Sequence, residues 1–263
     1  MIIRNIKLIC LFSLVLALMS FNPGKKAAYR VQKVVIDAGH GGKDSGTVGS
    51  FSKEKDVVLA IALKLGSIIK ENLPDVKVIY TRTDDTFIPL YSRSDIANKN
   101  DADLFISIHA NSQKNGHNAF GTETYIMGSH TSERNLEIAT KENSVILLEE
   151  DHKERYEGFD PNSPESYILF SLYQNAYFQN SLRLAYLIED QFKNRVKRHS
   201  RGVKQAGLLV LWRSAMPSVL IEVGFLSNAA EEKYLNDPQN QTYIASGIFR
   251  AIRDYKLEME SLN

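Results

Sequence analysis

Six short apolar runs, each bounded by turn-forming residues, recur along the chain and predict β-strands. They are rich in β-branched and aromatic side chains, and several are apolar at nearly every position, as in strands covered by helices on both faces. The runs are Lys33 to Gly39, Val76 to Arg82, Asp103 to Asn111, Thr122 to Gly128, Gly207 to Trp212 and Ser218 to Phe225. Together they predict one six-stranded sheet.

Between these runs, apolar residues recur at spacings of three and four, which is the period of a helix with one buried face. The first series is Val57, Val58, Ile61, Leu65, Ile68 and Ile69, and the second is Leu172, Tyr173, Ala176, Tyr177, Leu184, Leu187 and Ile188. Asp237 and Pro238 begin a last helix, whose expected core face holds Tyr243, Ile244, Ile248 and Ile252. The alternation predicts a single α/β domain with a mostly parallel sheet flanked by helices.

Residues 1–26 have the pattern of a secretory signal peptide. Arg4 and Lys7 precede an apolar run of twelve residues, Leu8 to Met19, and a polar, turn-forming segment follows. Such a run is too short to span a bilayer comfortably, and no clear cleavage site follows it. We therefore expect an exported, periplasmic protein with no transmembrane span in the mature chain. The alternative is an uncleaved interfacial anchor.

Charge and cysteine content exclude two classes of function. The 32 basic residues nearly balance the 31 acidic residues, so binding to nucleic acid is not expected. The single cysteine, Cys10, lies in the apolar run of the signal peptide. The mature chain would therefore contain neither a disulfide nor a thiol nucleophile.

Metal-ligand side chains follow or end three of the predicted strands. His40 follows the first, His109 ends the third, and Glu222 lies late in the last, while Glu54 opens the first predicted helix. In an open α/β sheet, sites form beyond the carboxyl ends of the strands, where these side chains would meet. Two imidazoles and a carboxylate can hold a hydrolytic zinc ion with one position left for water.

Other interpretations of the same residues remain open. The glycine-rich segment around His40 could be a simple turn or a phosphate loop, although its spacing fits neither common phosphate-binding motif. Glu222 lies in an apolar strand, where an unpaired carboxylate costs several kcal/mol. It could instead form an internal ion pair with Arg82 or Arg93.

Five ordered blocks of sequence, residues 34–47, 53–65, 80–112, 121–127 and 217–228, resemble the zinc-dependent N-acetylmuramoyl-L-alanine amidases of the AmiC-like type. They read VVIDAGHGGKDSGT, KEKDVVLAIALKL, YTRTDDTFIPLYSRSDIANKNDADLFISIHANS, GTETYIM and PSVLIEVGFLSN. The resemblance implies a catalytic domain over residues 30–258, zinc ligands His40, Glu54 and His109, and Glu222 as the catalytic residue. Asn111, Arg82 and Arg93 would support the site, and Asp37 and Asp44 would orient the histidines.

The implied reaction is hydrolysis of the amide between N-acetylmuramic acid and L-alanine in peptidoglycan, for wall remodelling and daughter-cell separation. Two alternatives belong to other classes. The chain could be an exported zinc carboxypeptidase with similar ligands, or a non-catalytic protein that binds the cell wall or activates another enzyme on the same fold.

A charged segment at about residues 141–170 is longer than the corresponding connection in minimal members of the family. It could be a solvated surface loop. By resemblance to regulated members, it would carry a helix that offers a carboxylate to the zinc, and Glu149 or Glu150 is the expected inhibitory ligand. An activator of the LytM-domain type would then move the helix of an otherwise monomeric enzyme.

Overall fold

A computed structural model describes residues 30–113, 118–129, 132–171 and 176–261 of the chain. The predicted signal peptide lies outside the described residues, as do Leu172 and Tyr173 of the second helical series. Among the described residues, no helix has both the length and the apolar character that crossing a bilayer requires.

The described strands form a six-stranded sheet in the order β2-β1-β3-β6-β4-β5. They are β1 (Lys33–Ala38), β2 (Lys77–Tyr80), β3 (Leu104–Asn111), β4 (Thr122–Met127), β5 (Ser200–Ala206) and β6 (Ser218–Phe225). Strand β4 runs antiparallel to β6, whereas the other neighbouring pairs are parallel. The expectation of a single α/β domain with a mostly parallel six-stranded sheet is confirmed.

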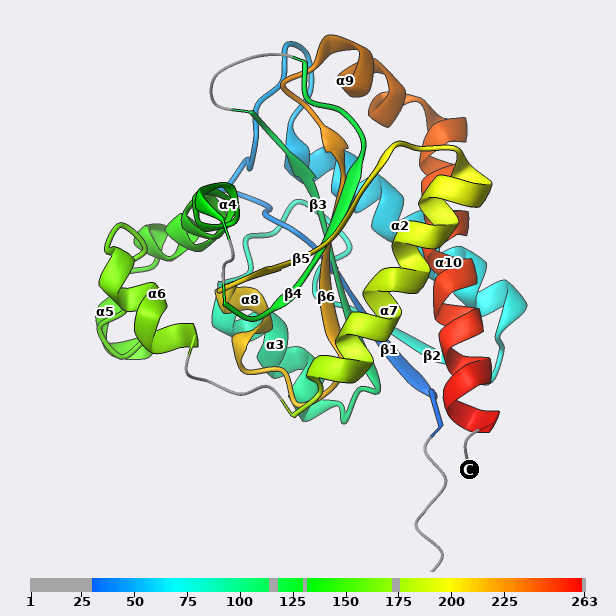
Figure 1. Ribbon diagram of the computed structural model, residues 1–263, viewed down its shortest axis with the longest axis horizontal. Helices are drawn as coiled ribbons and strands as arrows, with labels where there is room; N and C mark the ends of the chain where they lie inside the picture. The colour runs from blue at the N-terminus through cyan, green and yellow to red at the C-terminus, as the bar shows by residue number, and fades with distance from the viewer. Residues whose placement is uncertain (1–29, 114–117, 130–131, 172–175, 262–263) are drawn as a thin grey trace, which may run out of the picture.

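Helices cover both faces of this sheet (Figure 1). One face packs against α2 (Glu54–Asn72), α7 (Phe178–Gln191), which continues as η2 (Phe192–Val196), and α10 (Pro238–Ser261). The other face carries α3 (Leu90–Lys99), α4 (Glu133–Asn143), η1 (Ser144–Leu148), α5 (His152–Arg155), α6 (Pro164–Ser171) and α8 (Leu209–Trp212). Helix α9 (Ala229–Asn236) follows β6 at the carboxyl end of that strand.

Side chains alternate between the two faces along each strand. In β3, Ile106 and Ile108 join the core beneath α2 and α10, while Phe105 joins the core on the opposite face. His109 therefore lies on the Phe105 side, the face covered by α4. By the same alternation, Glu222 shares that face with Leu220 of the second core.

The sequence misplaced one strand. Gly207 to Trp212, expected as a strand, contains the short helix α8, and the edge strand is β5 just before it. A short apolar run fits a buried strand and a buried helical turn equally well, because its residues face protein on every side. Strand β5 has a polar sequence, SRGVKQA, and so gave no apolar signal.

The predictions for the first and last helices are confirmed in position. Helix α2 covers the whole first series, and α10 begins at Pro238 as expected. Ile244, Ile248 and Ile252 are buried on its core face, but Tyr243 is 48% exposed, so its assignment to the core was wrong.

Candidate metal centre

His40 lies in the loop after β1 and has a left-handed backbone, with φ of 60°. Such a conformation is uncommon for a residue with a side chain and is held by its surroundings. Its Nδ1 lies 2.7 Å from Oδ2 of Asp44, four residues along the chain. Asp44 thus orients the ring, and Nε2 is the atom left to face the site.

Two glycines make room for the histidine rings. A Cβ at Gly39 would lie 2.5 Å from the ring of His109, and one at Gly46 would lie 2.6 Å from Cδ2 of His40. Both distances are shorter than real contacts allow. The glycines of this loop therefore permit the approach of the two imidazoles, whose centroids lie 4.8 Å apart.

Glu54 is the first residue of α2 and is fully buried. Its carboxylate accepts hydrogen bonds from the backbone N–H groups of Thr47 and Ala110, each at 2.8 Å. Its Oε1 lies 3.0 Å from Nε2 of His40 and 3.2 Å from Nδ1 of His109. Backbone donors and the start of a helix thus fix a carboxylate between the two imidazoles.

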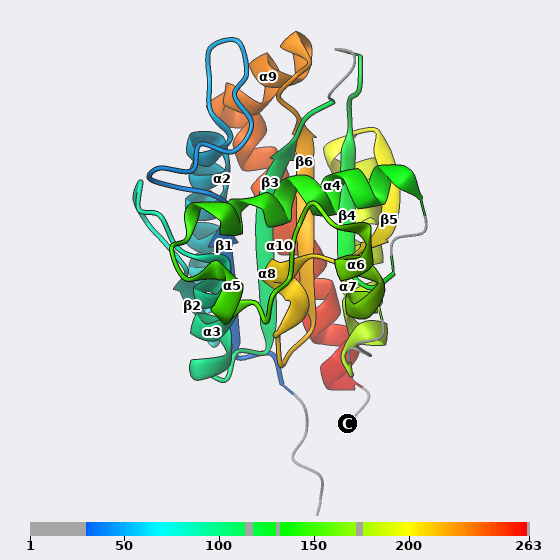
Figure 2. The same ribbon diagram turned by 90° about the vertical axis from the view of Figure 1, so that its left-hand side faces the viewer.

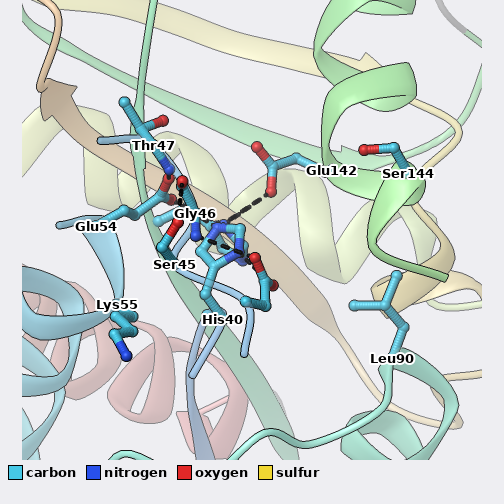
Figure 3. A network of polar contacts seen from close by, with 12 residues as sticks. His40, Ser45, Gly46, Thr47, Glu54, Lys55, Leu90, Glu142 and Ser144 are labelled. Carbon is cyan, nitrogen blue, oxygen red and sulfur yellow. Dashed lines mark hydrogen bonds and ion pairs between the residues drawn. The ribbon is translucent and has the colours of Figure 1, made fainter. Parts of the chain in front are cut away.

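A fourth side chain, Glu142 near the end of α4, completes the group (Figure 3). Its Oε2 lies 3.0 Å from Nδ1 of His109 and 3.6 Å from Nε2 of His40. One ligand atom from each of His40, Glu54, His109 and Glu142 lies within 4.8 Å of the others. All four side chains are buried.

The segment at residues 141–170 therefore does bring a carboxylate to the histidines, but it is a different carboxylate from the expected ones. Glu149 accepts hydrogen bonds from the backbone N–H of Leu90 at 3.1 Å and the hydroxyl of Tyr156 at 3.0 Å. Glu150 is exposed. Neither glutamate belongs to the four-residue group, because α4 ends at Asn143 and both residues lie beyond it.

Burial and neighbouring charges have opposite effects on the pKa values of the ionisable side chains in this group. Burial alone would lower the pKa of His40, but Glu54 and Asp44 outweigh it and raise the pKa to about 9. Burial likewise opposes ionisation of Glu142, yet Lys141 and His109 lower the pKa of this carboxyl to about 2. The Nζ of Lys141 lies 2.9 Å from Glu142 and 3.6 Å from Glu54. These buried carboxylates are thus stabilised by nearby positive charge.

The donor set fits a zinc ion. Two imidazole nitrogens and two carboxylate oxygens are ligands that zinc accepts in a four-coordinate site. Because Nδ1 of His40 faces Asp44, Nε2 is the nitrogen that can bind a metal once it releases its proton, and it makes no hydrogen bond to the described part of the chain. The cavity beside the group has a volume of about 10 Å³, which is room for one water molecule and not for a substrate.

Glu222 lies next to this group. It is fully buried, and its Cα pairs in register with that of His109 on the adjacent strand. Neither of its carboxylate oxygens has a hydrogen-bond partner among the described residues. Burial, reinforced by the nearby charge of Glu142, raises the pKa of Glu222 well above its usual value. An unpartnered buried carboxyl of this kind is suited to accept a proton.

The two arginines that could have paired with Glu222 are engaged elsewhere. Arg93 pairs with Asp37 at 2.8 Å and donates to the carbonyl of His40 at 2.8 Å. Arg82 donates to the carbonyls of Ala38 and Gly39 at 2.9 and 2.7 Å. Both arginines therefore brace the His40 loop through its backbone.

Of the two aspartates expected to orient the histidines, Asp44 contacts a histidine and Asp37 does not. Asp44 contacts His40 directly. Asp37 instead accepts hydrogen bonds from Thr81, Arg93 and Ser107, at 2.6, 2.8 and 2.7 Å, and so acts on the loop only through Arg93. The remaining support residue, Asn111, donates to Glu123 at 2.8 Å.

Comparison with known proteins identifies the family of this chain. Residues 34–254 match the N-acetylmuramoyl-L-alanine amidase family. The chain is 36% identical over 236 residues to the N-acetylmuramoyl-L-alanine amidase AmiA of Escherichia coli K12, covering 89% of this chain and 79% of AmiA. It is 35% identical over 241 residues to AmiC of Escherichia coli O6:H1, covering 89% of this chain and 55% of AmiC.

Solved structures show the same fold. The catalytic domain of CwlV, an amidase from Bacillus (Paenibacillus) polymyxa var. colistinus, is 34% identical with a TM-score of 0.63, covering 87% of this chain and 99% of that domain. An amidase from Clostridium difficile 630 is 31% identical with a TM-score of 0.65, covering 86% and 97%. The chain belongs to the N-acetylmuramoyl-L-alanine amidase family.

Proposed function

We propose that this protein is a zinc-dependent N-acetylmuramoyl-L-alanine amidase, which hydrolyses the amide between N-acetylmuramic acid and the L-alanine of the stem peptide. The observation that carries the proposal is a fully buried carboxylate without a hydrogen-bond partner, Glu222, in register with His109 of the four-residue group. Membership in the amidase family supports the same reaction.

His40, Glu54 and His109 would hold the zinc. When bound there, the ion would polarise the scissile carbonyl and lower the pKa of water toward neutrality. The chain keeps these ligands rigid, because Asp44 orients His40 and two backbone N–H groups fix Glu54. Ligands held in this way need little rearrangement during the reaction.

Glu222 would move the proton. It would take a proton from the attacking water and pass it to the nitrogen of the departing L-alanine. Its raised pKa, caused by burial, suits a group that must both accept and release a proton near neutral pH. Glu222 and Leu220, which project from the same face of β6, are both fully buried, so bulk water is excluded from the carboxyl group.

Glu142 would keep the enzyme closed. Its carboxylate lies where a water or a substrate carbonyl would need to approach, and the remaining cavity is about 10 Å³. Activation would therefore require α4 to leave, and a protein of the LytM-domain type is the partner proposed to shift the equilibrium toward the open state. The regulatory segment would be residues 141–170 together with the preceding turns of α4.

The setting proposed for this reaction is the periplasm, with peptidoglycan as substrate and daughter-cell separation as the process served. Residues 1–26 would direct export, and the mature enzyme would act as a monomer. The family membership supports the substrate, and the apolar pattern of Leu8 to Met19 supports the export.

Digestion of purified sacculi by the zinc-loaded mature protein tests the function, with Glu142→Ala included as an opened form. An amidase releases whole stem peptides with a free amine on L-alanine, which mass spectrometry identifies. Release of single carboxyl-terminal amino acids would instead indicate a carboxypeptidase. Absence of any product from a folded, zinc-loaded Glu142→Ala protein would indicate a non-catalytic member of the family.

A further inference from the structure

A row of polar side chains crosses the sheet beside the metal centre. The Cα of His109 on β3 pairs with that of Glu222 on β6, which pairs in turn with that of Glu123 on β4. Side chains at paired positions on neighbouring strands project from the same face of a sheet. The row therefore leads from the proposed zinc site across β6 to β4, on the face that α4 covers.

Three cations converge on Glu123 at the far end of this row. Its carboxylate is fully buried and lies 3.0 Å from Nζ of Lys204, 3.3 Å from Nε of Arg201 and 3.3 Å from Nη2 of Arg134. Both guanidinium groups also lie over the ring of Phe225, at 5.3 Å for Arg201 and 5.5 Å for Arg134. Two positive charges are thus present in excess of the one carboxylate.

An irregularity in β5 directs two of these cations to the same carboxylate. Arg201 and Lys204 are three residues apart, a spacing that would place them on opposite faces of a regular strand. The β4–β5 register shifts between Thr122 and Thr124, which inserts one extra residue in β5. Gly202, at φ of +83°, provides the backbone for this bulge.

Helix α4 covers the entire row, and Figure 2 shows it running across the strands. Glu142 contacts His109 at one end, and Arg134 contacts Glu123 at the other. These two residues are eight positions apart, so about 12 Å of helix lies over the row. The three strands β3, β6 and β4 span about 10 Å, so the helix and the row match in length.

We propose that Arg201 and Lys204 form a subsite for a carboxylate of the stem peptide, so that they determine which stems the enzyme prefers. The inference rests on the proposed function. Once α4 leaves, it removes Arg134 and Glu142 together, and Arg201 and Lys204 still outnumber the single charge of Glu123. An acidic group on the substrate would balance that surplus charge.

The position of the subsite agrees with the length of a peptide. The backbone of Arg201 lies two strands, about 10 Å, from that of Glu222, and its guanidinium group reaches back to Glu123, one strand or about 5 Å from Glu222. An extended peptide covers about 3.3 to 3.6 Å per residue, so this range corresponds to the second or third residue after the scissile amide. Lys204 and Arg201 are 20% and 24% exposed even beneath α4, so a ligand could reach them in the open state.

Two synthetic substrates test this subsite, using the full mature chain opened by Glu142→Ala. Each substrate is N-acetylmuramic acid linked to a tripeptide whose first residue is L-alanine. In one substrate the second and third residues carry free carboxylates, and in the other these carboxylates are amidated. We expect KM to be about tenfold lower for the free acid. Lys204→Met should raise KM for the free acid to that of the amide while leaving kcat within about twofold.

Two further variants separate recognition from a structural role. Lys204→Arg keeps the charge and should keep the preference, whereas Lys233→Met removes an exposed cation of α9 and should change neither KM. Equal KM values for the two substrates in the opened enzyme would overturn the subsite, and so would a Lys204→Met variant that weakens both equally.

Failure of the proposed function has a different signature. If neither substrate is cleaved, the affinity of the same proteins for the two free tripeptides, measured by calorimetry, still reports on the subsite. Tighter binding of the acid, lost in Lys204→Met, would support it. Equal affinities would overturn it.

Discussion

The Oε2 atom of Glu142 lies 3.0 Å from Nδ1 of His109, so a side chain of α4 faces the same imidazole as Glu54, which comes from α2. The two carboxylates are held near His109 in different ways. Glu54 is fixed by backbone N–H donors, whereas the position of Glu142 depends on the position of α4. The proposed metal ligands are therefore held rigidly, whereas access of a substrate to them depends on whether α4 is in place.

Removing the Glu142 carboxylate should open the enzyme. Glu142→Ala is expected to increase release of stem peptides from sacculi on the order of tenfold or more, because a competing ligand of the metal is lost. The measurement is product formation without any activator. Glu150→Ala is the matched control, since Glu150 is exposed in the same segment. Equal rates for Glu142→Ala and the unmodified chain would contradict the closing role.

Replacing Glu222 should slow turnover strongly without reducing zinc binding. Glu222→Gln keeps the size of the side chain but cannot accept the proton, so kcat should fall by about 10² to 10⁴ in the opened enzyme. Zinc content, measured by mass spectrometry of the intact metalloprotein, should stay near that of the parent because Glu222 is outside the four-residue group. Full activity with Gln at this position would assign the proton transfer to another residue.

Asp44 should act through His40. Asp44→Asn weakens the contact to Nδ1 of His40, which is 2.7 Å long, and is expected to lower zinc affinity by about 10- to 100-fold. Competition with a chromogenic chelator measures this affinity. Asp95→Asn, a change at a half-buried aspartate of α3 that pairs with Lys99, should leave the zinc affinity unaltered. A similar loss in both variants would point to a general effect of charge.

Glu232 should stabilise the loop before α2. It accepts hydrogen bonds from the backbone N–H groups of Ser50, Phe51 and Ser52, at 3.0, 2.9 and 2.9 Å, and from two serine hydroxyls. Although burial opposes ionisation, these bonds lower the pKa of Glu232 from 4.5 to about 2. A lowered carboxyl pKa stabilises the folded state above the unfolded pKa, and this contribution is lost as pH falls from 4.5 toward 2.

Glu232→Gln should therefore reduce the free energy of unfolding by about 2 to 3 kcal/mol at pH 7. The difference from the parent chain should shrink as the pH is lowered below 4.5. Urea unfolding at several pH values measures both quantities. The control Glu71→Gln, at an exposed position of α2, should shift stability by less than about 0.5 kcal/mol. A difference independent of pH would show that ionisation is not involved.

The sequence by itself determined the class of fold and most of the four-residue group. Alternating apolar runs predict a layered α/β domain, because strands covered on both faces must be apolar throughout. His40 and His109 could be assigned to one edge of the sheet because parallel strands end together there. Glu54 followed from its place at the start of the first helix and from the resemblance to the amidases.

Only the tertiary structure decided which residues face each other across elements that the sequence pattern does not link. Glu142 and not Glu149 reaches the histidines, because α4 crosses the sheet beside them and ends at Asn143, whereas Glu149 follows η1 and binds Leu90 and Tyr156. In the polar edge strand β5, a bulge directs both Arg201 and Lys204 toward Glu123. The pattern of apolar residues in the sequence does not predict this bulge. Local periodicity reports burial along one element, whereas charge pairing between elements depends on how they pack.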